Sequence, residues 1–164
     1  MEVFEDSQKK YAGFWLRFAA YILDQLILQT IIGLLMLPMI FGMVAGVITA
    51  SKEVGDASKA IAIISVVMGF IAILCVISII IGWLYYAIME SSKHQGTLGK
   101  MAVGVIVTDI EGNRISFARA TGRYFGKIIS TMTMYIGYIM AGFTVRKQAL
   151  HDIMSDCLVV KKNN

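Results

Sequence analysis

Residues 60–89 read AIAIISVVMGFIAILCVISIIIGWLYYAIM, thirty consecutive residues without a charged side chain. A transmembrane helix needs about 20 predominantly apolar residues to cross the hydrocarbon core of a bilayer. At about 1.5 Å per residue this run is longer than the core is thick, so the helix is expected to tilt or to project beyond it. Trp83, Tyr85 and Tyr86 crowd its far end, which is typical of the aromatic belt at the lipid headgroups. The stretch therefore predicts a transmembrane helix.

A similar apolar run near the N-terminus predicts another span, over about residues 14–43. It follows a polar flank of mixed charge, residues 1–13. The run is much longer than the 7–15 apolar residues of a signal peptide, so an uncleaved helix is expected. Pro38 is expected to kink or end this helix. Five polar residues interrupt the run: Arg17, Asp24, Gln25, Gln29 and Thr30.

The composition of the whole chain favours a membrane protein over other classes. Hydrophobic residues make up 57% of the 164 residues, and charged residues make up 16%. Soluble domains have about 45–50% apolar residues, with glycine counted, and about 25% charged residues. The formal net charge is +4, but the basic residues flank apolar segments instead of forming a patch on a soluble fold. This pattern argues against a nucleic-acid partner.

The middle of the chain, residues 90–116, is too polar and too short to span a bilayer. Residues 101–116, MAVGVIVTDIEGNRIS, are expected to form a β-hairpin, because Glu111-Gly112-Asn113 is turn chemistry between strand-forming segments. A further strand is expected over about residues 157–161, before a basic tail, residues 161–164. Since open strand edges do not occur in lipid, the β-element is expected at the cytoplasmic face, where the strands over residues 103–109 and 157–160 can pair.

A third apolar region covers about residues 117–145, and its topology can be argued from charge. Counts of lysine and arginine place the N-terminus, residues 90–127 and the C-terminus in the cytoplasm, and residues 51–59 outside. A single third span would put the C-terminal lysines outside. A helical hairpin or re-entrant pair with its bend at Gly137 avoids this conflict and is favoured over three spans. The predicted fold is thus an all-α membrane protein with two long transmembrane helices, a third helical segment and a small cytoplasmic β-element.

Asp24 is the most unusual residue of the first span. It lies ten residues after Phe14, near the expected middle of the bilayer, where a carboxylate costs about 2.5–3.5 kcal/mol on insertion scales. Two interpretations stay open: an ion or proton site, or a buried Asp–Arg pair that fixes helix packing. Arg17 shares a helical face with Asp24 but is about 10 Å away along the axis. The candidate partners are Tyr21, Gln25, Arg119, Arg123 and Lys127.

The remaining reactive residue types show no catalytic or metal-binding pattern. Cys75 and Cys157 do not form a CxxC pair and are expected to be unpaired structural thiols. His94 and His151 lie in polar segments and are expected to be surface or capping residues. HExxH, GxSxG and P-loop motifs do not occur in the sequence. We therefore expect no catalytic residue, no cofactor and no metal, and hence no enzyme.

Three blocks of sequence, in this order, resemble the RDD family of small membrane proteins. They are GFWLRFAAYILD (residues 13–24), TLGKMAVGVIVTDIEGNRIS (residues 97–116) and ALHDIMSDCLVV (residues 149–160). The family takes its name from an arginine at the start of the first helix, an aspartate within that helix and a second aspartate. The resemblance assigns these three roles to Arg17, Asp24 and Asp152, with Asp156 as the alternative for the last. The chain lacks the proline often found between the last helical pieces of the family.

The resemblance implies functional polar residues but little chemistry. Arg17, Asp24 and Asp152 are expected to form one cluster, which requires Asp152 to approach the cytoplasmic end of the first helix. Transport of unidentified ligands has been suggested for the family, and some members are fused to, or lie beside, other membrane or proteolytic functions. Partners of the three residues would come from the following set: Tyr21, Gln25, Arg119, Arg123 and His151.

Two functions follow from these observations. The first is a transporter of ions or small solutes in the plasma membrane, with cation/proton exchange as one version, in which Asp24 exchanges partners during the cycle. Two spans and a hairpin enclose a thin pathway, so this function would require a homo-oligomer. The second is a non-catalytic accessory or regulatory subunit of another membrane protein, such as a membrane protease. In both cases the lipid bilayer is a partner.

Overall fold

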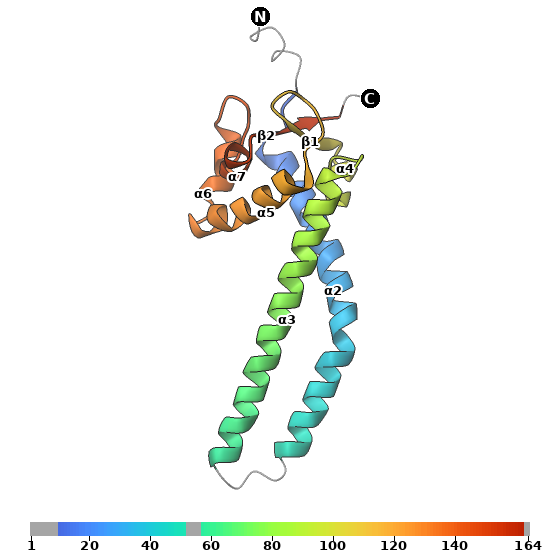
Figure 1. The fold of residues 1–164 in the computed structure, drawn as a ribbon, viewed down its shortest axis with the longest axis vertical. Helices are drawn as coiled ribbons and strands as arrows, with labels where there is room; N and C mark the ends of the chain where they lie inside the picture. The colour runs from blue at the N-terminus through green and yellow to red at the C-terminus, as the bar shows by residue number, and fades with distance from the viewer. Residues whose placement is uncertain (1–9, 52–56, 163–164) are drawn as a thin grey trace, which may run out of the picture. The chain divides into compact units, whose positions relative to one another are not determined.

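The computed structural model describes residues 10–51 and 57–162 of the chain. Most of the expected flank (1–13), the centre of the 51–59 connector and the end of the basic tail lie outside these ranges. The chain forms two compact units, residues 1–26 with 83–164 (the first unit) and residues 27–82 (the second unit). In chain order the elements are α2 (Phe14–Ser51), α3 (Ala57–Ser91), α4 (Leu98–Ala102), β1 (Val105–Asp109), α5 (Phe117–Met132), α6 (Ile136–Ile139), the 3₁₀ helix η1 (Met140–Gly142), α7 (Leu150–Met154) and β2 (Cys157–Lys161) (Figure 1).

The second unit consists of the long apolar parts of α2 and α3. Among the described residues, these are the two helices whose length and composition are sufficient to cross a membrane. Large apolar side chains such as Leu34 and Ile64 are exposed, as expected of helices that face lipid. Both helices extend beyond the ranges expected from the sequence, and Pro38 lies inside α2 without ending it. In lipid, backbone N–H and C=O groups cannot form hydrogen bonds with water in place of those of the helix. The helix therefore continues past a proline that would end it in a soluble protein.

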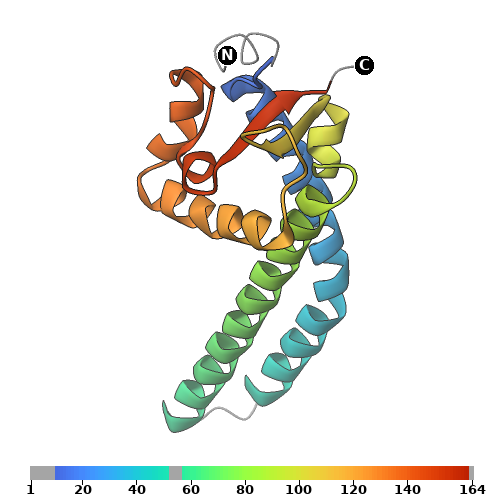
Figure 2. The same cartoon turned by 45° about the horizontal axis from the view of Figure 1, so that its top comes forward.

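The sheet of the first unit is formed by strands far apart in the sequence. β1 and β2 pair antiparallel, with Val107 opposite Val159, and Figure 2 shows the two strands side by side. The pairing of these two segments confirms an expectation from the sequence, whereas the hairpin expected over residues 101–116 is wrong, because residues 110–116 form no strand. The segment does turn after β1, where the Asp109 carboxylate accepts a hydrogen bond from the backbone N–H of Asn113 (2.7 Å). The polar residues after the turn form no strand, because the buried apolar side chains of β2 offer β1 a better partner.

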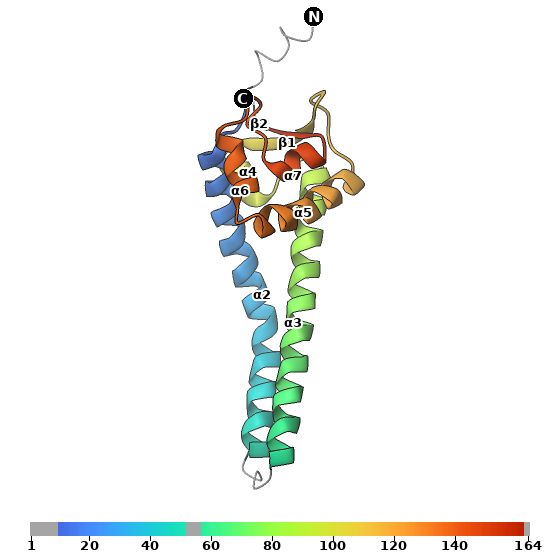
Figure 3. The ribbon, with the colours of Figure 1, turned by 90° about the vertical axis from the view of Figure 1, so that its left-hand side faces the viewer.

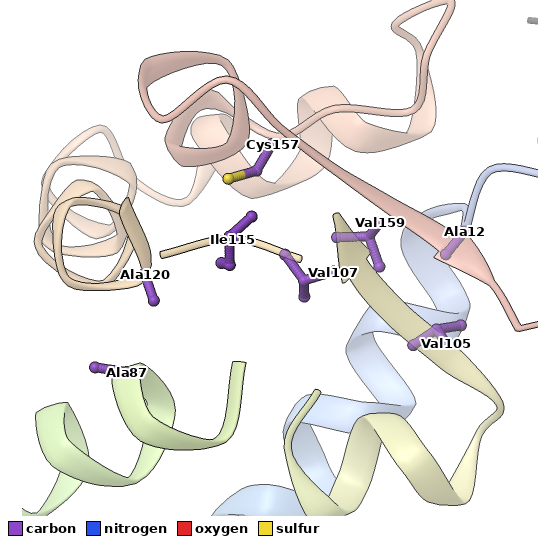
Figure 4. Packing of buried hydrophobic residues seen from close by; sticks show 8 residues of the cluster. All are labelled: Ala12, Ala87, Val105, Val107, Ile115, Ala120, Cys157 and Val159. Carbon is purple, nitrogen blue, oxygen red and sulfur yellow. The ribbon is translucent and has the colours of Figure 1, made fainter. Parts of the chain in front are cut away.

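The core of the first unit lies against this sheet. Figure 4 shows Ile115 pointing toward Val107, although Ile115 belongs to the loop after β1 and not to a strand. The buried apolar cluster draws on the segment before α2, on α3, on α5, on the loop after β1 and on both strands. Its members are Ala12, Ala87, Val105, Val107, Ile115, Ala120, Cys157 and Val159. The small sheet is therefore stabilised by packing against helices, since two strands alone are marginal in water.

The third apolar region forms a helix, a turn and a short helix. The 16 residues of α5 are about 24 Å long, too short to cross a hydrocarbon core of about 30 Å. The chain turns at Met134 and Tyr135, both with positive φ (51° and 65°), just before the position expected for the bend. Gly137 instead packs against α5, because a Cβ there would lie 2.8 Å from the Ser130 Cβ. Figure 3 shows α7 beside α5, with which it makes extensive contact.

Candidate functional site: two buried polar clusters

Asp24 is buried in the first unit and accepts three hydrogen bonds. The Tyr85 hydroxyl (2.7 Å) and the backbone N–H of Gly99 (2.7 Å) donate to Oδ1. The Thr97 hydroxyl donates to Oδ2 at 2.6 Å. We call Asp24, Tyr85, Thr97 and Gly99 the Asp24 cluster. Through it, one carboxylate holds together the first part of α2, the end of α3 and the start of α4.

The sequence around α4 is suited to this close approach. Thr97 is the N-cap of α4 and accepts a hydrogen bond from the backbone N–H of Lys100, while its hydroxyl proton is directed to Asp24. Gly99 lies directly against α2, because a Cβ at this position would be 2.2 Å from the Ala20 carbonyl oxygen. A glycine is therefore required here for contact with the neighbouring helix, and not for an unusual backbone conformation.

The partners expected for Asp24 lie elsewhere in the structure. Tyr21 is exposed, and the Gln25 amide donates to the Tyr86 hydroxyl at 3.5 Å. Arg119 forms an ion pair with Asp109 (3.9 Å) at the surface. The expected partners were charged residues and neighbours of Asp24 on its own helix, whereas the donors to Asp24 are hydroxyls and a backbone amide from distant segments.

A second buried cluster consists of charged side chains, and we call it the ion-pair cluster. Glu90, at the end of α3, contacts Lys100 (2.5 Å), Arg123 (2.7 Å) and, more distantly, Lys127 (3.7 Å). Its six members come from α2, α3, α4, α5 and α7: Arg17, Glu90, Lys100, Arg123, Lys127 and Asp152. Four cationic side chains therefore share two carboxylates, which leaves two positive charges in excess.

Arg123 occupies the centre of the ion-pair cluster. Its side chain is 2% exposed, and its guanidinium bridges Glu90 (Nη1 to Oε2, 2.7 Å) and Asp152 (Nε to Oδ1, 2.8 Å). The planar fork of arginine can bind two carboxylates at once, which the single ammonium of lysine does less well. α5 approaches α7 closely here, because Gly126 has no side chain between its backbone and His151. A Cβ added at Gly126 would lie 3.1 Å from the His151 Cβ.

Arg17 and Asp152 are in direct contact, although 135 residues separate them in the sequence. Arg17 also donates to the carbonyl oxygens of Ala12 (2.8 Å) and Lys147 (2.6 Å). Asp152 accepts a further hydrogen bond from the backbone N–H of Ala149 and so caps α7. The structure thus brings two of the three residues of the expected cluster together. It places Asp24 in the other cluster, which α4 connects to this one through Thr97 and Lys100.

The surroundings of each buried group shift its proton affinity. Burial would raise the pKa of Asp152, but Arg123 and Arg17 hold it well below its usual value. Burial lowers the pKa of Lys100, and the neighbouring Arg123 acts in the same direction, against the attraction of Glu90. Burial also lowers the pKa of His151 to about 3, so its ring is neutral at pH 7. Its Nδ1 lies 3.3 Å from the Ser130 hydroxyl.

We expect the neutral state of His151 to make stability depend on pH. Between about pH 6.5, the ordinary histidine value, and pH 3, the unfolded chain binds a proton that the folded chain does not. Stability should therefore fall as the pH is lowered through this range, by about 2 kcal/mol at pH 5. Unfolding followed in detergent at pH 7.5 and pH 5 measures this loss. His151→Asn should remove most of it, and the exposed His94→Asn should not; an equal loss in all three proteins would contradict the assignment.

Sequence reasoning missed five members of these clusters: Tyr85, Thr97, Gly99, Glu90 and Lys100. Glu90 terminates the long uncharged run of α3, so an acidic residue at the end of a span was a signal for a buried ion pair. Tyr85 was interpreted as part of an aromatic belt, and Thr97, Gly99 and Lys100 were considered as part of the family block over residues 97–116. Within residues 10–51 and 57–162, no group of three or more His, Cys, Asp or Glu side chains is placed to hold a metal ion.

Comparison with known proteins identifies a family and two similar proteins. The sequence profile of the RDD family matches residues 11–156. Two proteins of Bacillus subtilis (strain 168) are similar in sequence. The Uncharacterized protein YxaI is 36% identical over 156 residues, which cover 94% of this chain and 99% of YxaI. The Uncharacterized membrane protein YteJ is 31% identical over 156 residues, which cover 92% of this chain and 80% of YteJ. No solved structure matches.

Proposed function

This chain belongs to the RDD family of membrane proteins, and from that premise we propose that it is a non-catalytic subunit that assembles with another membrane protein. The observation that carries this proposal is the complete pairing of the two buried clusters. In the described part of the chain, every buried side-chain nitrogen and oxygen has a hydrogen-bond partner. Such a network favours one rigid arrangement of the first unit, which suits a surface that binds a partner. Because the cluster side chains all form hydrogen bonds or ion pairs with one another or with the backbone, none of them is positioned as a nucleophile.

The lengths of the helices support a position of the polar clusters at the membrane surface. Residues 27–51 of α2 are about 37 Å long at about 1.5 Å per residue, which is enough to cross the hydrocarbon core. Asp24 precedes this stretch and contacts Thr97, in the polar irregular connection between α3 and α4, and Gly99, in the first turn of α4. Irregular backbone of this kind is unfavourable in lipid. Asp24 then belongs at the headgroup level and not, as the sequence suggested, at the bilayer middle.

The number of spanning helices supports termini on the cytoplasmic side. Two spans return the chain to the side on which it began, and α5 is too short to cross again. We then expect α5 to lie along the membrane–water interface. Its Arg123 side chain is buried inside the first unit, and its Phe125 side chain is exposed. In intact cells, a membrane-impermeant maleimide should label Lys59→Cys and spare Lys162→Cys. The reverse pattern would contradict this orientation.

The exposed apolar face of α5 is the surface for which we expect a protein partner. It includes Phe125, Ile128, Ile129 and Met132. A photo-crosslinking residue in place of Phe125 should give one discrete adduct with a different membrane protein in native membranes. The same residue in place of the exposed Leu34 of the second unit serves as the control. Adducts at Phe125 with lipid alone, or with a second copy of this chain alone, would contradict the subunit proposal.

Ion transport is the second candidate function, and Lys100 favours it. A buried lysine with a lowered pKa gives up its proton more readily than usual, which a proton-coupled transporter requires. The excess positive charge of the ion-pair cluster disfavours a metal cation there. Proteoliposomes with an internal pH dye, exposed to Na⁺, K⁺ or Li⁺, test this function. A pH change that is lost in folded Asp24→Asn would support transport by a homo-oligomer, and no change in either protein would support the subunit proposal.

A further inference from the structure

We propose that the first unit binds one anionic phospholipid in a groove between the start of α2 and the segment from α6 to Lys147. The groove has a volume of about 390 Å³, within the range of ligand sites. Its walls include Phe14, Trp15, Ile139, Gly142, Phe143 and Lys147. We call it the Lys147 groove. The proposal needs the chain to lie in a membrane, but it does not depend on a protein partner or on transport.

The walls of the Lys147 groove are apolar and aromatic. The side chains of Trp15 and Phe143 are 76% and 85% exposed, which is unfavourable in water. Phe14 supports this wall, because its ring stacks on Phe18 and meets Trp15 edge to face. Phe14 and Trp15 both belong to the first turn of α2, which begins at Phe14. The groove therefore offers an exposed apolar and aromatic wall within the first unit.

Lys147 supplies the charge that selects an anionic headgroup. Its ammonium donates to the Gly142 carbonyl oxygen (2.9 Å), which fixes it beside the apolar wall. An ammonium has three donors, so this bond leaves donor capacity for a phosphate oxygen. The backbone of Lys147 has a positive φ of 50°. The carbonyl oxygen of Lys147 accepts a hydrogen bond from the Arg17 guanidinium (2.6 Å). The guanidinium of Arg17 therefore lies next to the backbone of Lys147. Arg17 belongs to the ion-pair cluster, which has excess positive charge.

The combination of a fixed cation and an apolar groove matches a phospholipid better than the other possible occupants. A free phosphate would use the cation and leave the aromatic walls exposed. A second copy of this chain would bring further basic residues, since the net charge is +4. An anionic phospholipid satisfies both features, with its phosphate at Lys147 and an acyl chain along Phe14 and Phe143.

Native mass spectrometry of the full chain in detergent, with added phosphatidylglycerol or phosphatidylcholine, tests the proposal. Wild-type protein should retain one phosphatidylglycerol in preference to phosphatidylcholine. Lys147→Gln should weaken the binding of phosphatidylglycerol about fivefold and leave that of phosphatidylcholine unchanged. Lys162→Gln, which removes the same charge from an exposed position outside the groove, is the matched control. Equal effects of the two lysine variants would overturn the proposal.

A second variant tests the apolar wall without changing charge. A Cβ at Gly142 would meet the Phe14 Cβ at 3.8 Å, an ordinary contact, so Gly142→Leu should fold and fill the groove. It should lose both lipids, whereas Gly122→Leu, where the added Cβ meets nothing within 4 Å, should keep them. Retention of phosphatidylglycerol by Gly142→Leu would overturn the proposal. A wild-type dimer that Gly142→Leu dissociates would also overturn it, in favour of a second copy in the groove.

Discussion

Replacement of Arg123 by alanine is expected to lower the free energy of unfolding by about 3–5 kcal/mol, the usual cost of removing one partner of a buried ion pair. Arg123 is 2% exposed and is hydrogen-bonded to both Glu90 and Asp152. The two carboxylates raise its pKa above the ordinary value, against the effect of burial, so the variant removes a charge that both of them need. Unfolding by denaturant in detergent micelles measures the loss.

Arg119→Ala is the matched control, because it removes the same side chain one turn earlier on α5. Arg119 is 40% exposed and forms a single ion pair of 3.9 Å with Asp109, which contributes about 0–1 kcal/mol. Arg123→Lys should be intermediate, since an ammonium cannot reproduce the bridge to both carboxylates. Similar losses for Arg123→Ala and Arg119→Ala would mean that the ion-pair cluster does not organise the first unit.

The two long helices could be predicted from the sequence because their signal is local. An uncharged run such as residues 60–89 has few alternatives to a helix able to cross a bilayer, whatever the rest of the chain does. The end of α2 was less predictable, because the expected effect of Pro38 holds for helices in water. The turn within the third apolar region depended on two non-glycine residues with positive φ, Met134 and Tyr135, which no residue preference indicates.

The strand pairing shows a limit of local reasoning. The turn at Glu111-Gly112-Asn113 exists, but the strand that follows a turn need not pair across it. β1 pairs with β2, about 50 residues later in the chain, because the buried side chains of Cys157, Leu158 and Val159 complete a core that the polar residues after the turn cannot. The sequence offered β1 two partners, the segment after the turn and the strand over residues 157–160, and the choice between them required the tertiary structure.

The polar sites were predictable by residue type and less so by partner. Arg17 and Asp152 were singled out together through the family resemblance, and they are in contact. Asp24 was singled out by its position in an apolar helix, but a search for countercharges could not find Tyr85, Thr97 and Gly99. Hydroxyl and backbone donors are abundant in any sequence, so only the three-dimensional arrangement identifies those that bind a carboxylate.

Gly99→Ala is expected to lower the free energy of unfolding by about 3 kcal/mol or more, although it adds only one methyl group. The new Cβ would lie 2.2 Å from the Ala20 carbonyl oxygen and 2.9 Å from the Asp24 carboxylate. The first of these atoms belongs to the backbone of α2 and cannot rotate away, so α4 must move. Overpacking of this kind costs about 1–3 kcal/mol, and the hydrogen bonds of Asp24 to Gly99 and Thr97 are lost in addition.

Gly122→Ala makes the same chemical change at an exposed position of α5, where the added Cβ meets nothing within 4 Å. It should be neutral or slightly stabilising, since alanine favours helix over glycine. Asp24→Asn keeps the space between α2 and α4 but exchanges a carboxylate for an amide, so it should cost less than Gly99→Ala. If Gly99→Ala unfolds at the same denaturant concentration as Gly122→Ala, α4 does not lie against α2. Asp24 would then be accessible to an exchangeable ligand. That result would support ion transport and count against the subunit proposal.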